Sequence, residues 1–94
     1  MKAAAAPPAP ANGGQPSMEA LNEELLAAHA RKDGAALARL YTKAADRHES
    51  AGEIDAACFF LTHAFVFALE AGAPEAKALN IRLASRGRAH MLTF

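Results

Sequence analysis

The stretch from Tyr41 to Ala64 alternates small and large side chains at helical spacing, and it constrains the fold more than any other part of the chain. Before a short turn at 50–53, a helical stripe is formed by Tyr41, Ala44, Ala45 and His48. After the turn, the same spacing continues with Ala57, Leu61 and Ala64. Gly52 supplies the backbone freedom that a tight turn needs. The pattern therefore predicts two helices that fold back on each other.

Composition extends this prediction to the whole chain. Alanine makes up roughly a quarter of the residues and β-branched residues are scarce, which favours helix over strand. Ser17 is a good N-cap for a first helix that ends near Lys32, where Asp33-Gly34 breaks it. Further helices are expected at 35–50, at 53–70 and from Pro74 to just before Gly87. The expected fold class is all-α, with four short helices whose brief loops make them antiparallel neighbours.

The two ends of the chain differ from this helical part. Residues 1–17 are rich in alanine, proline and glycine and poor in large apolar side chains, so we expect a flexible tail there. The helical domain is expected at 18–87, followed by a short C-terminal tail at 88–94. That tail contains Met91, Leu92 and Phe94, which either dock on the helices or fray.

The third predicted helix is apolar on almost every side, so other helices must cover it on several sides. Its expected inner stripe is Ile54, Ala57, Cys58, Leu61, Phe65 and Leu69, while Phe59, Phe60, Val66 and Phe67 occupy its other sides. The apolar run is shorter than the ~20 residues of a membrane span, which predicts a core helix. The other three helices have expected inner stripes too. In the first helix the stripe is Leu21, Leu25, Leu26, Ala28 and His29, and in the second it is Leu37, Leu40, Tyr41, Ala44, Ala45 and His48. In the fourth it is Ala76, Leu79, Asn80 and Leu83. If each loop joins two antiparallel helices, the following residues are expected to be neighbours in space: Leu25 and Tyr41, Tyr41 and His63, Phe60 and Ala44, and Val66 and Leu79.

Residues 38–70 resemble one tetratricopeptide repeat, a helical hairpin that usually holds a partner protein. Tyr41 stands at the aromatic position of the family's first helix, Gly52 at its turn glycine, and Ala57 and Ala64 at the small positions of its second helix. Ala45 replaces the usual glycine of the first helix, and no proline ends the second. The resemblance implies a right-handed stack of helical hairpins, with structural roles for Tyr41, Ala45, Gly52, Ala57, Leu61 and Ala64. A plain four-helix bundle is the alternative.

The resemblance also implies a binding surface. In the family, exposed positions of the first helix line the groove, and these correspond to Arg39, Thr42, Asp46, Glu49 and Ser50. Some members clamp a peptide carboxylate with basic and asparagine side chains, but Thr42 and Asp46 occupy those places here. The alternative is that these five residues form an ordinary solvated face.

No motif for catalysis, a cofactor or a metal stands out. The four histidines lack the spacing of a zinc site, and the single cysteine, Cys58, lies in an apolar run where a buried thiol is expected. A lone cysteine also favours an intracellular, cytoplasmic protein. Cations gather toward the end of the chain at Lys77, Arg82, Arg86 and Arg88, but a helix C-terminus favours cations without any ligand. Because the formal net charge is zero, neither nucleic acid nor membrane is an expected partner.

These observations predict a small, non-enzymatic adaptor that binds a protein or peptide. A different class, a homo-oligomeric structural or regulatory protein, is the alternative; its interface would include Phe59, Phe60 and Phe67. A third hypothesis is a regulatory domain that binds an apolar ligand among the phenylalanines.

Overall fold

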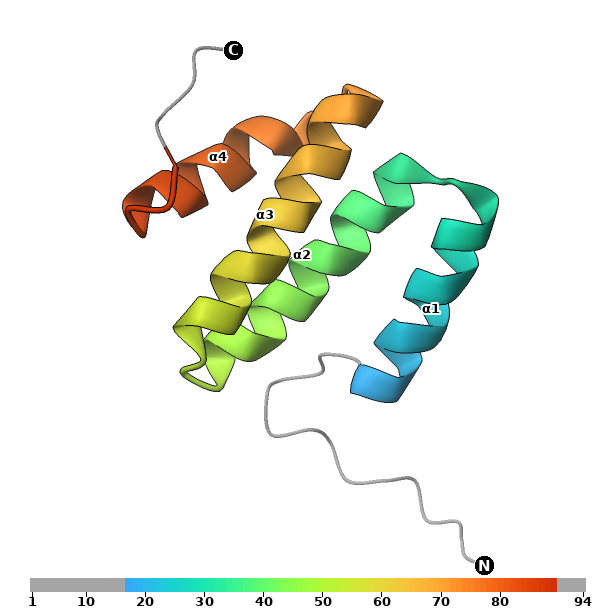
Figure 1. Cartoon of the computed structure of the whole chain (residues 1–94), viewed down its shortest axis with the longest axis horizontal. Coiled ribbons are helices and arrows are strands. Elements are labelled where there is room, and N and C mark those ends of the chain that lie inside the picture. Colours follow the sequence, from blue (N-terminus) through green and yellow to red (C-terminus); the bar gives the residue numbers. More distant parts are fainter. Residues whose placement is uncertain (1–16, 90–94) are drawn as a thin grey trace, which may run out of the picture.

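The computed structural model describes residues 17–89, and within them the chain is all-α (Figure 1). Its four helices are α1 (Met18–Arg31), α2 (Gly34–Ser50), α3 (Ile54–Ala71) and α4 (Glu75–Ser85). No strand occurs between residues 17 and 89. Most of the two predicted tails lies outside this range, including Met91, Leu92 and Phe94. Of the C-terminal tail, Arg88 pairs with Asp55 at 2.6 Å and Ala89 packs against the core.

The helix ends follow local signals that the sequence carries. Ser17 caps α1 by accepting a hydrogen bond from the backbone N–H of Ala20 at 3.1 Å. Gly52 and Gly72 adopt the left-handed backbone (φ 79° and 65°) just after α2 and α3, as predicted. Pro74 is the N-cap of α4 rather than its first residue, and α4 ends at Ser85.

The break between α1 and α2 differs from the prediction. Lys32, not a glycine, adopts the left-handed conformation that ends α1 (φ 55°). Asp33 then caps α2 by accepting a hydrogen bond from the N–H of Ala36 at 3.1 Å, and Gly34 is the first residue of α2. The new helix begins directly after the break because its cap is supplied within the turn itself.

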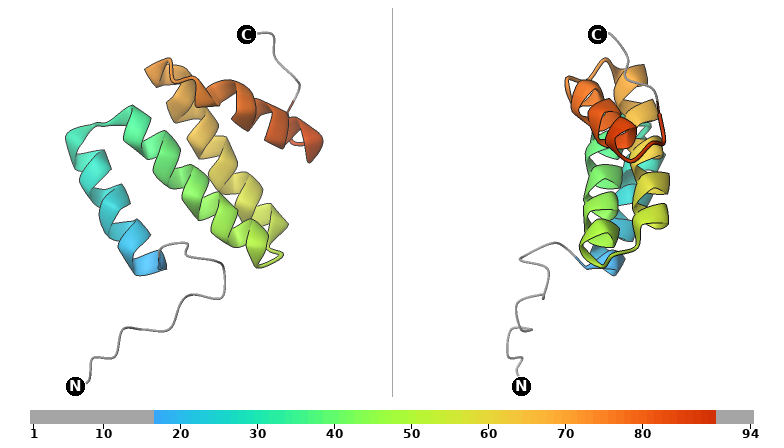
Figure 2. Two further views of the ribbon diagram at one scale, coloured as in Figure 1. Left: turned by 180° about the vertical axis from the view of Figure 1, so that it is seen from behind. Right: turned by 90° about the vertical axis from the view of Figure 1, so that its left-hand side faces the viewer.

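Helix α2 is the centre of the arrangement (Figure 1). Helices α1 and α3 both pack against it and run antiparallel to it, as expected, and the α2–α3 contact is the most extensive in the fold. Helix α4 packs on α3 and turns back from its C-terminal end at an oblique angle (Figure 2). It is therefore less closely aligned with its neighbour than α1 and α3 are with α2 (Figure 1).

Two clusters of buried side chains hold the helices together, and α2 contributes to both. Toward α3 and α4, the cluster contains Ala38, Ala45, Cys58, Leu61, Ala64, Ala68, Ala76, Leu79 and Leu83. Toward α1, it contains Leu21, Leu25, Ala28, Ala36, Leu37, Leu40 and Ala44. The small residues predicted to have structural roles, Ala45, Ala57 and Ala64, are all essentially inaccessible to solvent. Alanines on both sides of the α2–α3 contact let the two backbones approach closely.

Helix α3 is covered on far fewer sides than the sequence predicts. Its buried residues are Ala57, Cys58, Leu61, Ala64 and Ala68. Leu69, placed in the inner stripe by the sequence analysis, is 45% exposed. In α1, Leu26 is 71% exposed and His29 is also exposed, so these two assignments are wrong as well. The reason is that α1 packs mainly on α2, so no helix within residues 17–89 covers the outer side of α3.

Of the four predicted pairings, Tyr41 with His63 is confirmed, and the residues of two others pack on one common cluster. The rings of Tyr41 and His63 lie 5.4 Å apart, and Tyr41 and Phe60 both pack against the cluster that contains Leu25 and Ala44. Val66 is 44% exposed and lies outside the cluster that contains Leu79. The predicted inner stripe of α4 is confirmed, because its four residues are all buried, Asn80 included.

Replacing Ala64 with leucine should disrupt the α2–α3 contact, because this alanine has no exposed surface. We expect Ala64→Leu to lower the free energy of unfolding by about 1–3 kcal/mol through overpacking. Ala78 is an exposed residue of α4, so Ala78→Leu is the matched control and should change that energy by less than about 0.5 kcal/mol. Urea unfolding followed by circular dichroism measures both. Parent-like stability of Ala64→Leu would contradict the close packing of α2 and α3.

Candidate functional site

The five groove positions implied by the repeat resemblance do not form one open surface. Arg39 and Ser50 are exposed, whereas Thr42 is half-buried and its hydroxyl donates a hydrogen bond to the carbonyl oxygen of Ala38 at 2.7 Å. Asp46 and Glu49 face α4 and form ion pairs with it. The α4 side of the expected groove is therefore occupied by the protein's own charges.

The ion pairs between α2 and the C-terminal end of α4 form a compact group. A guanidinium nitrogen of Arg82 lies 2.8 Å from Asp46 and 3.2 Å from Glu49, and Arg86 reaches the other carboxylate oxygen of Glu49 at 2.7 Å. The hydrogen bond from Arg86, assisted by the positive charge of Arg82, holds the pKa of Glu49 below its ordinary value, although partial burial opposes this shift. Three of the four cations that gather near the end of the sequence, Arg82, Arg86 and Arg88, are thus paired within the fold.

Tyr41 lies at the centre of an aromatic cluster that joins α1, α2 and α3. Its ring stacks on Phe67 and Phe60, with centroids 5.8 and 6.0 Å away, and its hydroxyl lies 3.0 Å from Nε2 of His29. Phe60 also stacks on His48 at 5.1 Å. Two of the three residues predicted to form an interface, Phe60 and Phe67, are therefore half-buried and engaged inside the protein. Their main contribution is to packing.

Phe59, the third predicted interface residue, has a different environment. Its side chain is 59% exposed, although its ring contacts Phe60 at 5.4 Å and His63 at 4.5 Å. Val66 and Leu69 follow on the same side of α3 and are 44% and 45% exposed. Together with the exposed Thr62 between them, these residues form what we call the α3 outer stripe: Phe59, Thr62, Val66 and Leu69.

The spacing along α3 explains why this stripe exists and how it could have been found. The buried set 57, 61, 64 and 68 and the exposed set 59, 62, 66 and 69 both recur at three- and four-residue intervals, so each follows its own side of the helix. Leu69 was expected in the inner stripe and Val66 on another side of the helix, and neither was expected at an interface. The recurrence of large apolar residues at 59, 66 and 69 was the sequence signal that could have identified this side.

The length and composition of α3 would also allow it to cross a membrane. This is weak evidence, because core helices of soluble proteins have the same properties. In the fold, its buried side packs against α2 and α4, and the outer stripe supplies much of its remaining apolar character.

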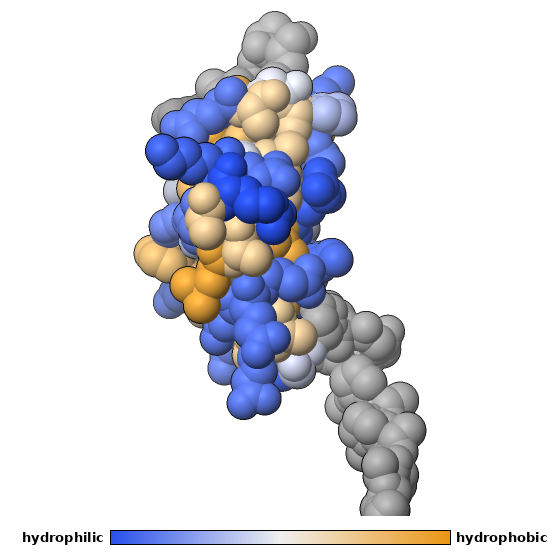
Figure 3. Space-filling model, turned by 90° about the vertical axis from the view of Figure 1, so that its right-hand side faces the viewer, coloured by the Kyte–Doolittle hydropathy of each residue, from blue (hydrophilic) through white to orange (hydrophobic). Residues whose placement is uncertain are grey.

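The exposed Leu26 lies on α1, whose side of the molecule is largely polar with small apolar patches between the charged residues (Figure 3).

Groups that carry chemistry are sparse in the described part of the chain. Between residues 17 and 89, no three His, Cys, Asp or Glu side chains gather as ligands for a metal. Cys58 is buried, at 3% exposure. Nδ1 of His48 pairs with Glu53 at 2.6 Å across the α2–α3 turn. The His48–Glu53 contact stabilises the local structure of this turn.

Removing the charge of Glu49 should destabilise the protein in a pH-dependent way. Because the folded-state pKa is lowered, the ion pairs stabilise the fold fully above pH 4.5, the ordinary pKa, and lose this effect as the pH falls through the folded-state pKa. We expect Glu49→Gln to lower the free energy of unfolding by about 0.2–1 kcal/mol at neutral pH, because the group is partly exposed. The difference from the parent should shrink in acid.

Glu23→Gln is the control, since Glu23 is exposed on α1 and forms no ion pair with any residue in 17–89. Urea unfolding at a series of pH values measures both variants. A Glu49→Gln effect that is the same at neutral and acid pH would contradict the assigned role of this carboxylate.

Comparison with protein-family models, with curated proteins and with solved structures finds no match to this chain. The function must therefore be inferred from the geometry alone.

Proposed function

We propose that this chain is a small, non-enzymatic interaction module of the adaptor or scaffold type, which binds a protein or peptide along the α3 outer stripe. The observation that carries the proposal is the exposure of three large apolar side chains on one side of α3. Phe59, Val66 and Leu69 are 59%, 44% and 45% exposed. Contiguous exposed apolar groups of this kind typically mark interaction surfaces in soluble proteins.

The stripe has the features that a helical partner needs. Its side chains recur at three- and four-residue intervals, which is the arrangement that packs into the grooves of another helix. The opposite side of α3 is fixed by Leu61, Ala64 and Ala68 in the core, so the stripe is held on a rigid element before any partner binds. A surface that is already ordered loses little conformational entropy on binding.

The alternative groove on α2 is less suited to this role. Asp46 and Glu49 are already paired with Arg82 and Arg86, so a ligand there would have to displace internal ion pairs. Binding along α3 leaves these pairs intact. A cytoplasmic location, as proposed from the lone cysteine, agrees with a module of this kind.

The competing hypothesis from a different class is a homo-oligomer in which a second copy covers the same stripe. The observation in its favour is the apolar nature of the stripe, which is compatible with self-pairing of two α3 helices. The adaptor proposal predicts that the purified protein is monomeric in light scattering at micromolar concentration. A dimeric mass that is lost in Phe59→Ser would favour the homo-oligomer instead.

A photo-reactive amino acid in place of Val66 tests the adaptor proposal directly. In the native cell, we expect cross-links from this position to one recurrent foreign protein, and we expect Phe59→Ser to reduce their yield because it removes the most exposed ring of the stripe. The matched control carries the same photo-reactive group at Lys77, an exposed position on α4.

Equal yields of the same product from positions 66 and 77 would contradict specific binding on α3. Cross-links from position 66 only to a second copy of the chain would replace the adaptor by the homo-oligomer.

A further inference from the structure

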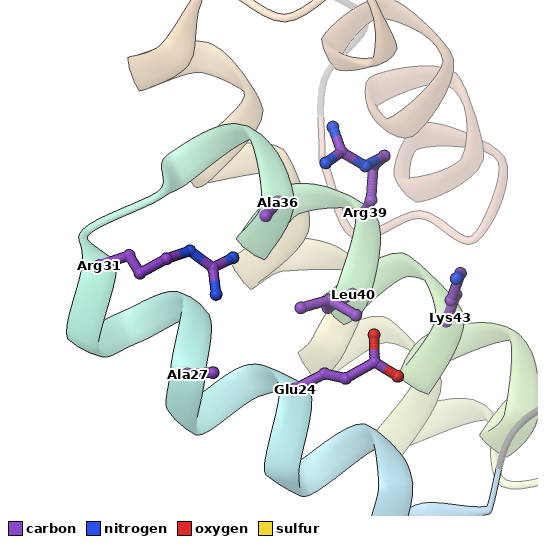
Figure 4. Close-up of a pocket in the computed structure, with 7 residues that line it drawn as sticks. All are labelled: Glu24, Ala27, Arg31, Ala36, Arg39, Leu40 and Lys43. Atoms are coloured by element: carbon purple, nitrogen blue, oxygen red, sulfur yellow. The ribbon is translucent and has the colours of Figure 1, made fainter.

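A second surface feature lies between α1 and α2, on a different side of α2 from the α3 contact. It is a cleft whose apolar floor is formed by Ala27 of α1 with Ala36 and Leu40 of α2 (Figure 4). Ala36 and Leu40 belong to the core cluster that faces α1, whereas Ala38 and Ala45 on another side of the same helix face α3. The cleft is therefore separate from the α3 outer stripe.

Positive side chains surround this floor. Arg31 enters from α1, Arg39 and Lys43 come from α2, and Glu24 is the one carboxylate that residues 17–89 contribute to the lining (Figure 4). Arg31 has a partner, Asp33, at 3.4 Å. Arg39 and Lys43 are exposed, and neither forms a hydrogen bond or ion pair with any residue in the described range 17–89. The lining thus contains three cations and one anion in a chain whose formal net charge is zero.

The cations of this cleft differ from the arginines near α4 in whether they are paired within the fold. The arginines on and after α4 are neutralised by Asp46, Glu49 and Asp55, so their charge is used within the fold. The positive field of the cleft acts on Asp33, whose pKa is lowered first by the hydrogen bond from the backbone N–H of Ala36 and further by Arg31 and Arg39. Asp33 caps α2 and pairs with Arg31, so Arg39 and Lys43 are the cations of the lining that have no hydrogen-bond or ion-pair partner within residues 17–89.

We propose that the α1–α2 cleft binds an acidic segment of a protein partner. Carboxylates of the segment pair with Arg39 and Lys43, and an apolar side chain between them packs on Ala27, Ala36 and Leu40. Arg31 contributes a further positive charge at the α1 side. This site goes beyond the proposed use of the α3 outer stripe, and neither surface requires the other.

The composition of the cleft favours a peptide over a nucleic acid. Single-stranded nucleic acids are bound by basic grooves that also contain aromatic rings on which bases stack. Among the described residues no aromatic side chain lines this cleft, and its floor consists of small or aliphatic residues. Such a floor suits an aliphatic side chain flanked by carboxylates.

A fluorescein-labelled peptide with the sequence Glu-Glu-Glu-Leu-Glu-Glu-Glu is a suitable probe, and fluorescence anisotropy with the full chain measures its affinity. We expect binding that weakens as salt is raised, because the contacts are made at the surface. The peptide with glutamine at all six glutamate positions should bind at least tenfold more weakly. Arg39→Gln and Lys43→Gln should each weaken binding of the acidic peptide by roughly threefold to tenfold.

Lys77→Gln is the matched control, because it removes one positive charge from an exposed position on α4, outside the cleft. Circular dichroism establishes that each variant keeps the parent's helicity. The proposal is overturned if the acidic and glutamine peptides bind equally or not at all, or if Lys77→Gln weakens binding as much as Arg39→Gln does. It is also overturned if labelled oligothymidylate binds more tightly than the acidic peptide and loses affinity in the same two variants.

Discussion

The contact between α2 and α3 determines how the other parts of this molecule are placed. It is built from alanines on both helices, Ala38 and Ala45 on α2 with Ala64 and Ala68 on α3, and each is at most 1% exposed. Small side chains permit close approach of the two helices, and close approach increases the dispersion contacts between them. Because small residues and Leu61 occupy the side of α3 that makes this contact, the phenylalanines of α3 lie on its other sides.

The large side chains on the other sides of α3 fall into two groups. One group is packed inside the protein, and the exposed group forms the surface to which we assign the proposed function. Phe60 and Phe67 extend toward Tyr41 and close the space beside α1 by stacking. Phe59 and Leu69 lie farther round the helix, where neither α1 nor α4 reaches, and stay substantially exposed. One side of the apolar helix α3 therefore stabilises the fold, and another side is exposed to solvent. The α1–α2 cleft arises independently, because α2 also contacts α1 through a separate set of buried residues.

The sequence predicts the features that depend on nearby residues. The all-α class, the cap at Ser17 and the glycine stops at Gly52 and Gly72 follow from interactions within a few positions, and all are present. Features that depend on distant residues were not predictable in the same way. Asp46 and Glu49 looked like free groove residues because their partners, Arg82 and Arg86, lie more than thirty positions away; the Glu49–Arg86 pair, for example, spans 37 residues. On α3, Phe59 was expected at an interface but Leu69 was expected inside, since a helix that is apolar almost all round gives little contrast between its buried and exposed sides.

The exposure of the α3 outer stripe in solution is the central claim, and hydroxyl-radical labelling at low protein concentration tests it most directly. Three leucines with the same intrinsic reactivity provide the comparison: Leu69 at 45% exposure, and Leu61 and Leu79 at 1% and 3%. The structure predicts that Leu69 is oxidised much faster than the other two, with Phe59 labelled rapidly as well. Protection of Leu69 and Phe59 to the level of Leu61 would contradict the claim, because it would mean that another part of the chain or a second copy covers the stripe.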